Sequence, residues 1–350
     1  MWWITWRDLV HRRRRFLLAG AATALAFSVA LMMSGVVVAV NNQNARVVHR
    51  FHADGWWVPR GAGGPFTAGP VVPDAVAADL VARPGVRRAE PVVLLRTTLS
   101  DHASESVTDV NLVGIGVDGL GRPNIDHGRW IRRTGETVLD ASLGYHVGDL
   151  VHTGGLAFRV VGVSKGLSYL FAVPTMFLSL PDAQAVGAGG QQASSAVVTQ
   201  GLPQSGGPPG MVRYDDRAVL RDLNRVIGKG LSAVQTVQAI MVIAAAAIVA
   251  LIIYLSALER VRDIAVLKAS GARNGFVAVG LVAQGLVVTV PATVAAFAIA
   301  RLLRPVFPLE LVLTAGVQLQ LALLAAGVGV LASLVGVRRV LRVDPATAFG

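Results

Sequence analysis

Four long apolar runs constrain what this 350-residue chain can fold into more than any other feature. They cover residues 16–40, 231–257, 276–303 and 319–338. A helix of about 20 apolar residues crosses about 30 Å of hydrocarbon, so each run predicts a transmembrane helix. The core of a signal peptide has only about 7–15 residues, so the length of the first run favours a retained span over a cleaved leader.

The overall composition fits a mixture of spans and one large domain. Mean hydropathy is +0.57 and 53% of the residues are hydrophobic, which is high for a soluble domain and low for a chain buried entirely in lipid. Residues 41–230 carry 18 basic and 16 acidic side chains, so most of the net charge of +11 lies in short segments beside the apolar runs. That distribution is typical of a topology signal and argues against a nucleic-acid partner. The absence of cysteine excludes a disulfide scaffold and thiolate metal sites.

Basic clusters predict the orientation. One cluster, Arg12–Arg15, precedes the first run, and two others follow the second and fourth runs. Those two consist of Arg260, Arg262, Lys268 and Arg273, and of Arg338, Arg339 and Arg342. An even number of spans puts all three on one side, which the positive-inside rule makes cytoplasmic. We therefore expect a multi-pass protein of the bacterial inner (plasma) membrane with both termini in the cytoplasm. Arg301 and Arg304, beside the external loop 304–318, count weakly against this rule.

The predicted fold is a membrane protein with four transmembrane α-helices and a large α+β extracytoplasmic domain, residues 41–230, inserted between helices 1 and 2. The domain is expected to contain a helix over Asp74–Ala82, a second helix beginning at Pro181, and several strands. The strands are predicted over Pro91–Leu99, Val110–Val117, Thr137–Asp140, Asp149–Thr153, Leu156–Val163 and Val173–Leu180. Gly154-Gly155 predicts a two-residue hairpin turn, and residues 200–210 predict a loop. From Asp215 an amphipathic helix runs toward the second span, with Gly228 and Gly230 as a possible hinge.

Three segments are predicted on the cytoplasmic side: residues 1–15, 258–275 and 339–350. Residues 1–15 place tryptophans on one helical face and mostly charged residues on the other, which suits an amphipathic helix lying along the membrane surface. In 258–275, Leu258, Val261 and Ala265 form an apolar stripe at helical spacing, and Gly271 ends the helix. Such a helix can insert its stripe into a groove on a partner, with charges fixing the register. The alternative is a solvated basic loop that only sets the topology.

The same segment carries a resemblance to a known family. It reads Ala257-Leu-Glu-Arg-Val-Arg-Asp-Ile-Ala-Val-Leu-Lys-Ala-Ser-Gly-Ala-Arg273 and resembles the cytoplasmic motif of FtsX-like permeases, a family that includes the MacB, LolC/LolE, DevC and FtsX groups. The matching residues are Glu259, Arg260, Arg262, Asp263, Ile264, Leu267, Lys268, Ala269, Gly271 and Ala272. Residues 83–89 resemble part of a MacB-type periplasmic domain. Residues 344–349 resemble the family's ending, with Phe349 in place of the usual leucine.

The resemblance implies a permease subunit of an ABC transporter, with the matching residues forming a coupling helix that docks on a separate ATPase. ATP and Mg²⁺ would bind to that partner, and no cofactor to this chain. The family implies export or extraction of a lipid, lipoprotein, peptide or drug, a second permease copy (identical or a paralogue), and a possible adaptor or enzyme outside. One alternative is an FtsX-like regulator of an extracellular enzyme. Another is a membrane-anchored sensor or adhesion protein without an ATPase.

Residue patterns for catalysis or metal binding are weak. The nearest approach to a Walker A motif, residues 227–232, lacks its first glycine, so we expect a non-catalytic subunit. His49 and His52 could share a helical face but lack an acidic partner at metal-ligand spacing. The neighbours Asp101, His102 and Ser104 have triad residue types without triad geometry. Asp215-Asp216 predict the start of a helix.

Within the spans, three small residues occur at four-residue spacing: Ala325, Gly329 and Ser333. Such a row lets helices approach closely, although it also follows from alanine-rich composition. Gln284 is expected to hydrogen-bond across helices and Pro291 to kink its helix.

Overall fold

The computed structural model describes residues 13–69, 71–100, 107–259, 266, 274–306 and 312–341. It divides into two compact units. We call Met1–Ala39 with Leu231–Gly350 the helix unit, and Val40–Gly230 the sheet unit.

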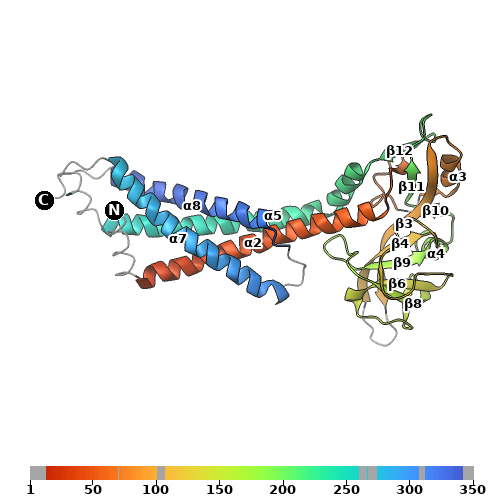
Figure 1. Ribbon diagram of the computed structural model, residues 1–350, viewed down its shortest axis with the longest axis horizontal. Helices are drawn as coiled ribbons and strands as arrows, with labels where there is room; N and C mark the ends of the chain where they lie inside the picture. The colour runs from red at the N-terminus through yellow and green to blue at the C-terminus, as the bar shows by residue number, and fades with distance from the viewer. Residues whose placement is uncertain are drawn as a thin grey trace. The chain divides into compact units, whose positions relative to one another are not determined.

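Four helices are long and apolar enough to cross a membrane, which confirms the four-span prediction (Figure 1). They are α2 (Arg13–Arg50), α5 (Asp216–Glu259), α7 (Asn274–Leu303) and α8 (Ala315–Leu341), and a short 3₁₀ turn, η2 (Arg304–Val306), follows α7. Helix α2 continues past the apolar run that ends at residue 40, and α5 begins well before residue 231. Helix α5 is continuous through Gly228 and Gly230, and the boundary between the two units follows Gly230, so the hinge expected at these glycines stays a prediction. Its backbone hydrogen bonds outweigh the helix penalty of about 1 kcal/mol that each glycine carries.

The helix unit is held by an apolar core and a few polar contacts. Phe16 of α2 is buried with Ile253 of α5, Leu281 of α7 and Ala332 of α8. Gln284 Nε2 donates to Ser256 Oγ at 2.9 Å, which is the interhelical hydrogen bond expected of this glutamine. Gln238 Nε2 on α5 donates to Ser34 Oγ on α2 at 2.8 Å.

The sheet unit contains a ten-stranded mixed sheet, which confirms the α+β prediction. Its strand order is β12-β1-β11-β3-β4-β9-β6-β8-β5, with β7 paired to β3 and β8. Beside it lies a two-stranded sheet of β2 and β10. The strands are β1 (Gly55–Pro59), β2 (Val72–Pro73), β3 (Val86–Ser100), β4 (Val107–Ile115), β5 (Ile125–Gly128), β6 (Glu136–Asp140), β7 (Leu150–Thr153), β8 (Leu156–Ser164), β9 (Thr175–Ser179), β10 (Ala193–Ser194), β11 (Ala196–Gly201) and β12 (Met211–Tyr214). Two pairings, β4 with β9 and β6 with β8, are parallel.

The predicted local elements of the domain are largely found. Helix α3 (Ala75–Val81) and helix α4 (Leu180–Ala188) lie where they were expected, and the latter carries proline in its first turn. Gly154 (φ 56°) and Gly155 (φ 78°) form the β7–β8 hairpin turn, which needs positive φ at both positions. A further 3₁₀ turn, η1 (Ala141–Leu143), follows β6.

Some strands were not predicted from the sequence. Strand β1 pairs with β11 and β12, and β11 also pairs with β3. The loop expected over residues 200–210 is wrong at its start, because Gln200 and Gly201 belong to β11. These strands depend on partners distant in the chain, so their short apolar runs gave no local signal.

Candidate mechanical coupling site

The helices of the first two spans, α2 and α5, each have one end inside the core of the sheet unit. Helix α2 contributes Val47 and Val48, and Phe51 follows directly after its last residue; all three are at most 4% exposed. Helix α5 contributes Val219 and Leu223, which are fully buried. These side chains pack in one cluster with β-sheet residues that include Trp56, Val113 and Val198. Complete burial of one such side chain contributes about 1.5–3 kcal/mol, so the five together contribute on the order of 10 kcal/mol as an upper estimate. The ends of α2 and α5 are therefore structural parts of this domain.

A polar contact joins the two helices inside the sheet unit. Asn44 of α2 is fully buried, and its Nδ2 donates to Asn224 Oδ1 of α5 at 2.9 Å. Its Oδ1 accepts a 3.4 Å hydrogen bond from the backbone N–H of Leu170. Because a buried amide is costly when unpaired, this arrangement favours one register of the two helices.

Residues 165–174, which we call the clamp loop, connect both helices to the sheet. Asn111 Nδ2 of β4 donates to the carbonyls of Tyr169 (3.1 Å) and Val173 (3.0 Å). At the other side of the loop, the Phe171 ring packs against Gly230 of α5, where an added Cβ would lie 2.8 Å from the ring. Leu170 reaches α2 through the hydrogen bond to Asn44. The loop thus contacts α2, α5 and the central sheet.

The clamp loop is strained. Leu170, Phe171 and Ala172 all have left-handed backbone conformations, with φ of 54°, 65° and 60°. A residue with a Cβ adopts this conformation at a cost of about 1–2 kcal/mol. Three such residues in succession persist only where surrounding contacts over-determine the loop, and such strain is often found at moving parts.

Asp222 fastens α5 to a second loop of the sheet unit. Its carboxylate is 4% exposed and accepts hydrogen bonds from the backbone N–H groups of Gly64 (3.2 Å) and Phe66 (3.1 Å) and from Thr67 Oγ1 (2.8 Å). Charge-assisted bonds of this kind are stronger than neutral ones. They hold the loop over residues 61–69 against α5.

The junction continues at the helix ends. Asp216 Oδ2 contacts His49 Nδ1 at 3.1 Å, and Trp56 Nε1 donates to Asp216 Oδ1 at 3.4 Å. Asp215 Oδ1 caps α5 by accepting from the backbone N–H of Ala218 at 2.7 Å. The idea that His49 and His52 share a helical face is wrong, because α2 ends at Arg50. Among the described residues no group of three potential metal ligands occurs.

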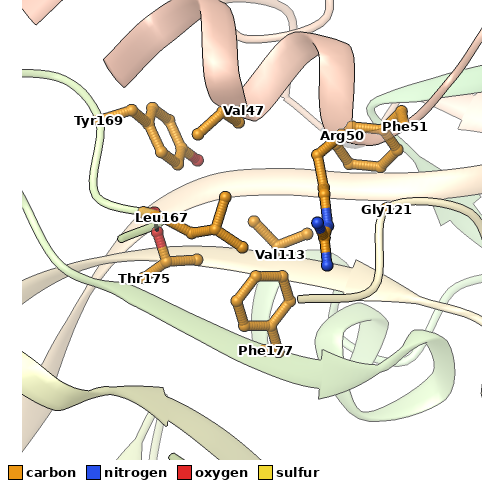
Figure 2. Close-up of a pocket in the computed structure, with 9 residues that line it drawn as sticks. All are labelled: Val47, Arg50, Phe51, Val113, Gly121, Leu167, Tyr169, Thr175 and Phe177. Atoms are coloured by element: carbon orange, nitrogen blue, oxygen red, sulfur yellow. Dashed lines mark hydrogen bonds between the residues drawn. The ribbon is translucent and has the colours of Figure 1, made fainter. Parts of the chain in front are cut away.

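The end of α2 and the residue that follows it also line a small pocket of about 10 Å³ (Figure 2). Val47, Arg50 and Phe51 face apolar side chains that include Val113 and Phe177. Arg50 leaves the pocket to donate to the carbonyl of Arg122 and to Asn124 Oδ1. Burial raises the pKa of the Tyr169 hydroxyl well above its ordinary value, so the hydroxyl stays protonated. The pocket is therefore a packing space around the helix end, with an arginine closing its rim.

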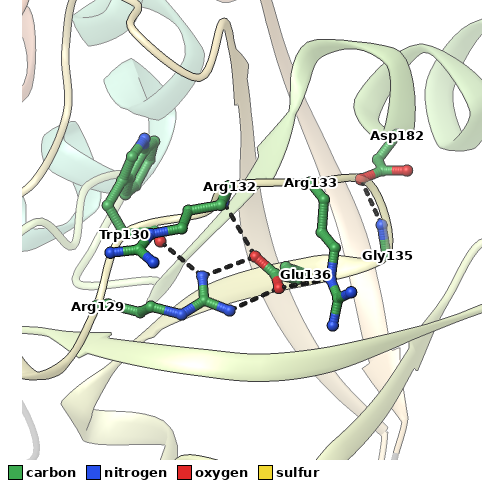
Figure 3. A network of polar contacts seen from close by, with 7 residues as sticks. All are labelled: Arg129, Trp130, Arg132, Arg133, Gly135, Glu136 and Asp182. Atoms are coloured by element: carbon green, nitrogen blue, oxygen red, sulfur yellow. Dashed lines mark hydrogen bonds and ion pairs between the residues drawn. The ribbon is translucent and has the colours of Figure 1, made fainter.

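A separate ionic cluster stabilises the β5–β6 connection (Figure 3). Arg129 makes a two-bond contact with Glu136, at 2.7 and 2.9 Å, and Arg133 Nε adds a third at 3.1 Å. The hydrogen bond from Arg129 lowers the pKa of Glu136 to about 2, assisted by the Arg132 backbone N–H and by Arg133 and opposed by desolvation. Glu136 in turn raises the pKa of Arg129. Nearby, Asp182 accepts from the Gly135 backbone N–H at 2.9 Å.

The structure describes only part of the predicted site. Of the predicted coupling residues, Glu259 is the last residue of α5. The others lie outside the described residues: Arg260, Arg262, Asp263, Ile264, Leu267, Lys268, Gly271 and Ala272. Asp101, His102, Ser104 and residues 1–12 also lie outside them.

The predicted packing row is described in full. Ala325 and Ser333 of α8 are buried, and Gly329 lies against α7. A Cβ added to Gly329 would lie 2.7 Å from Thr289 Oγ1, and one added to Gly285 would lie 2.4 Å from the Gly329 carbonyl oxygen.

Sequence reasoning missed Asn44, Asn224, Asp222 and the clamp loop. A usable signal was present in residues 41–44, Asn-Asn-Gln-Asn, because this polar group follows the first span directly and continues its helix. The sequence of the clamp loop gave no such signal, because the residues with left-handed backbone conformations in it are not glycines.

These features define a membrane protein whose first and second spans both continue into one mixed-sheet domain. Residues 236–345 match the FtsX-like permease C-terminal family. Two ABC transporter permeases of Mycobacterium tuberculosis (strain ATCC 25618 / H37Rv), Rv0072 and Rv2563, are each 32% identical to this chain over 344 residues, which is 98% of both chains. The chain belongs to the FtsX-like ABC transporter permeases, as its cytoplasmic motif predicted.

Two solved structures are also similar. The extracellular domain of the noncanonic ABC-type transporter YknZ from Gram-positive bacteria shares 17% identity, with a TM-score of 0.36, covering 47% of this chain and 100% of that one. The periplasmic region of MacB from Actinobacillus actinomycetemcomitans shares 13% identity, with a TM-score of 0.36, covering 48% and 91%.

Proposed function

We propose that this chain is a mechanical permease subunit: a separate ATPase moves its cytoplasmic coupling segment, and α2 and α5 carry that movement to the sheet unit. The observation that supports this most is helix continuity. Each helix begins or ends in the helix unit and has its other end built into the sheet-unit core. Glu259, the first residue of the coupling motif, is the last residue of α5. A helix is stiff along its axis, so a displacement at one end reaches the other.

The proposed orientation follows from the basic clusters, with residues 41–230 outside and both termini in the cytoplasm. In this scheme ATP and Mg²⁺ bind to the partner ATPase, and the substrate is handled by the external domain and exported or extracted. Four spans enclose little space for a pathway, so a second copy or a paralogue would complete the assembly. The family's substrate classes are lipids, lipoproteins, peptides and drugs.

Docking can be tested with paired variants of the coupling segment. Ile264→Asp with Leu267→Asp places charge on its apolar stripe and is expected to abolish pulldown of a co-expressed ATPase encoded in the same operon. Val266→Asp is the matched control, because Val266 is 57% exposed. Equal recovery of the ATPase by both variants would refute docking at this helix.

Transmission can be tested within α5. Val226 is 49% exposed in the helical part of the sheet unit, so Val226→Pro breaks the helix without removing a core side chain, whereas Val226→Ala preserves it. Because the chain has no cysteine, Gln191→Cys allows a single environment-sensitive label on the sheet unit. An ATP-dependent change in label fluorescence should persist with Val226→Ala and vanish with Val226→Pro, with ATPase recovery unchanged. A signal that survives the proline would contradict transmission through α5.

The same label tests the orientation. Cysteine at Gln191 should react with a membrane-impermeant maleimide in intact cells, whereas Val266→Cys should react only after lysis. Reaction of both in intact cells would place them in one compartment and overturn the scheme.

A further inference from the structure

Helix α5 contains two glycines, Gly228 and Gly230, at the end of its sheet-unit portion. Glycine is among the least favourable residues inside a helix, because its backbone loses the most freedom when it is fixed. A Cβ added to Gly228 would meet no atom of the described residues within 4 Å, so packing does not require glycine there. Gly230 is the last residue of the sheet unit. The two glycines therefore mark the position at which α5 bends most easily.

One aromatic ring of the sheet unit covers this position. The ring belongs to Phe171, at the tip of the clamp loop, and a Cβ added to Gly230 would lie 2.8 Å from its Cε2 atom. Ordinary van der Waals contacts are 3.4–4 Å, so the ring occupies the space that any other residue at position 230 would need. Gly230 thus forms a seat for Phe171 on the surface of α5.

The base of the clamp loop is fixed to the sheet, and its tip is not. Thr175 Oγ1 of β9 donates to the carbonyl of Leu167, and both residues lie in the packed region below the end of α2 (Figure 2). Tyr169 and Val173 exchange two backbone hydrogen bonds, of 3.2 and 3.0 Å. Only the three residues between them form the tip, so a movement of Phe171 requires no rearrangement of the base.

The conformation of the tip carries several costs. Leu170, Phe171 and Ala172 are all left-handed, and the Leu170 N–H reaches Asn44 Oδ1 only at 3.4 Å. Asn111 Oδ1 is buried and has no hydrogen-bond partner among the described residues. Backbone strain and an unpaired acceptor oppose the seated tip, whereas the ring contact and the amide hydrogen bonds favour it. Two conformations of similar free energy are what a switching element requires.

We propose that Phe171 is a latch on α5. With the ring seated on Gly230 the helix is rigid; when the tip relaxes to a right-handed or extended backbone, the ring leaves and α5 bends at Gly228 and Gly230. This inference rests on the proposed function for its purpose, since a rigid α5 carries movement to the sheet unit and a bent α5 does not. All parts of the latch belong to the sheet unit of one chain, so its operation needs no ATPase.

The first test is hydrogen exchange of the purified full-length permease, without ATPase or nucleotide, followed by mass spectrometry. Phe171→Ala removes the ring and Gly230→Ala blocks its seat, so both should speed exchange in peptides covering residues 168–174 about tenfold, because local opening becomes less costly. Gly228→Ala is the matched control, since it adds the same methyl group to α5 without a clash and should exchange like wild type. Unchanged exchange in β3 and β4 shows that each variant is folded.

The second test measures bending of α5. The chain has no cysteine, so spin labels can be placed at Gln191→Cys on the sheet unit and at Ile243→Cys, which is 67% exposed on α5 beyond the glycines. Double electron–electron resonance should give a distance distribution about twice as wide in Phe171→Ala as in wild type, because the glycines then bend freely. Replacing both glycines by alanine in the Phe171→Ala background should restore the wild-type width, since alanine stiffens the helix.

Three results would overturn the latch. Equal exchange of the clamp loop in wild type, Phe171→Ala and Gly230→Ala would show that the ring does not hold the tip. An equal acceleration by Gly228→Ala would assign the effect to α5 itself. Faster exchange without a wider label distribution would show that the loop opens without freeing the helix. Both measurements use the permease alone, so a failure of ATPase docking would not alter them and the two proposals fail separately.

Discussion

Helices α7 and α8 approach each other closely at Gly285 and Gly329. The distance between them there predicts how much stability an added side chain at Gly285 would cost. A Cβ at Gly285 would lie 2.4 Å from the carbonyl oxygen of Gly329, whereas ordinary contacts are 3.4–4 Å. The atom it meets is backbone, so Gly285→Ala requires the helices to separate by about 1 Å. Overpacking of this kind typically costs about 1–3 kcal/mol.

The matched control is Gly327→Ala on α8, where an added Cβ meets no atom within 4 Å. Both variants gain the same helix propensity of about 1 kcal/mol, so their difference isolates the clash. For a unit of this size 1 kcal/mol corresponds to about 2–4 °C, so a 2 kcal/mol clash should make Gly285→Ala melt about 4–8 °C below Gly327→Ala.

The assay is thermal unfolding of the two detergent-purified variants at equal protein concentration, followed by intrinsic fluorescence and by loss of the monodisperse peak in size-exclusion chromatography. Equal melting temperatures for the two variants would refute the helix contact. A lower melting temperature for Gly327→Ala would place the close approach at the wrong face of α8.

Three further predictions concern the sheet unit. Asp222→Asn replaces an acceptor of three hydrogen bonds with a partial donor and should cost about 1–3 kcal/mol, measured as urea unfolding; an unchanged midpoint would contradict the loop contact. Ala172→Gly relieves the left-handed backbone strain at residue 172, and the greater entropy of glycine in the unfolded chain offsets part of this gain. The variant should therefore raise the free energy of unfolding by about 0.5–1 kcal/mol. The control Ala188→Gly, at a helix end, should not raise it. The folded pKa of Glu136 is depressed to about 2 from 4.5, so its contribution is present above pH 4.5 and is lost as pH falls toward 2. The full difference corresponds to about 3 kcal/mol, which exposure of its arginine partners reduces to about 1–2 kcal/mol. Glu136→Gln should remove that acid-dependent loss of stability. An identical dependence of the free energy of unfolding on pH in wild type and variant would refute the contribution of Glu136.

The sequence identified the elements whose signals are local. The four apolar runs predicted transmembrane helices because about 20 uninterrupted apolar residues have few structural alternatives. Gly154-Gly155 predicted its hairpin because only residues that tolerate positive φ form that turn, and Pro181 predicted a helix start because its fixed φ suits a first turn. The family was also readable locally, since its motif lies in one short segment, residues 257–273.

The tertiary structure decided how the spans join the domain. That α2 extends to Arg50 and buries Phe51 beside Trp56 depends on strands far along the chain, because residues 45–51 mix apolar with charged side chains. Asn44 and Asn224 are 180 positions apart, and the local sequence around each residue does not predict their hydrogen bond. The left-handed clamp loop contradicts its own residue preferences and exists only through contacts with Asn111, Asn44 and Gly230. Sequence by itself determines the features that depend on neighbours in the chain, whereas contacts that close long loops exist only after the whole fold has brought their residues together.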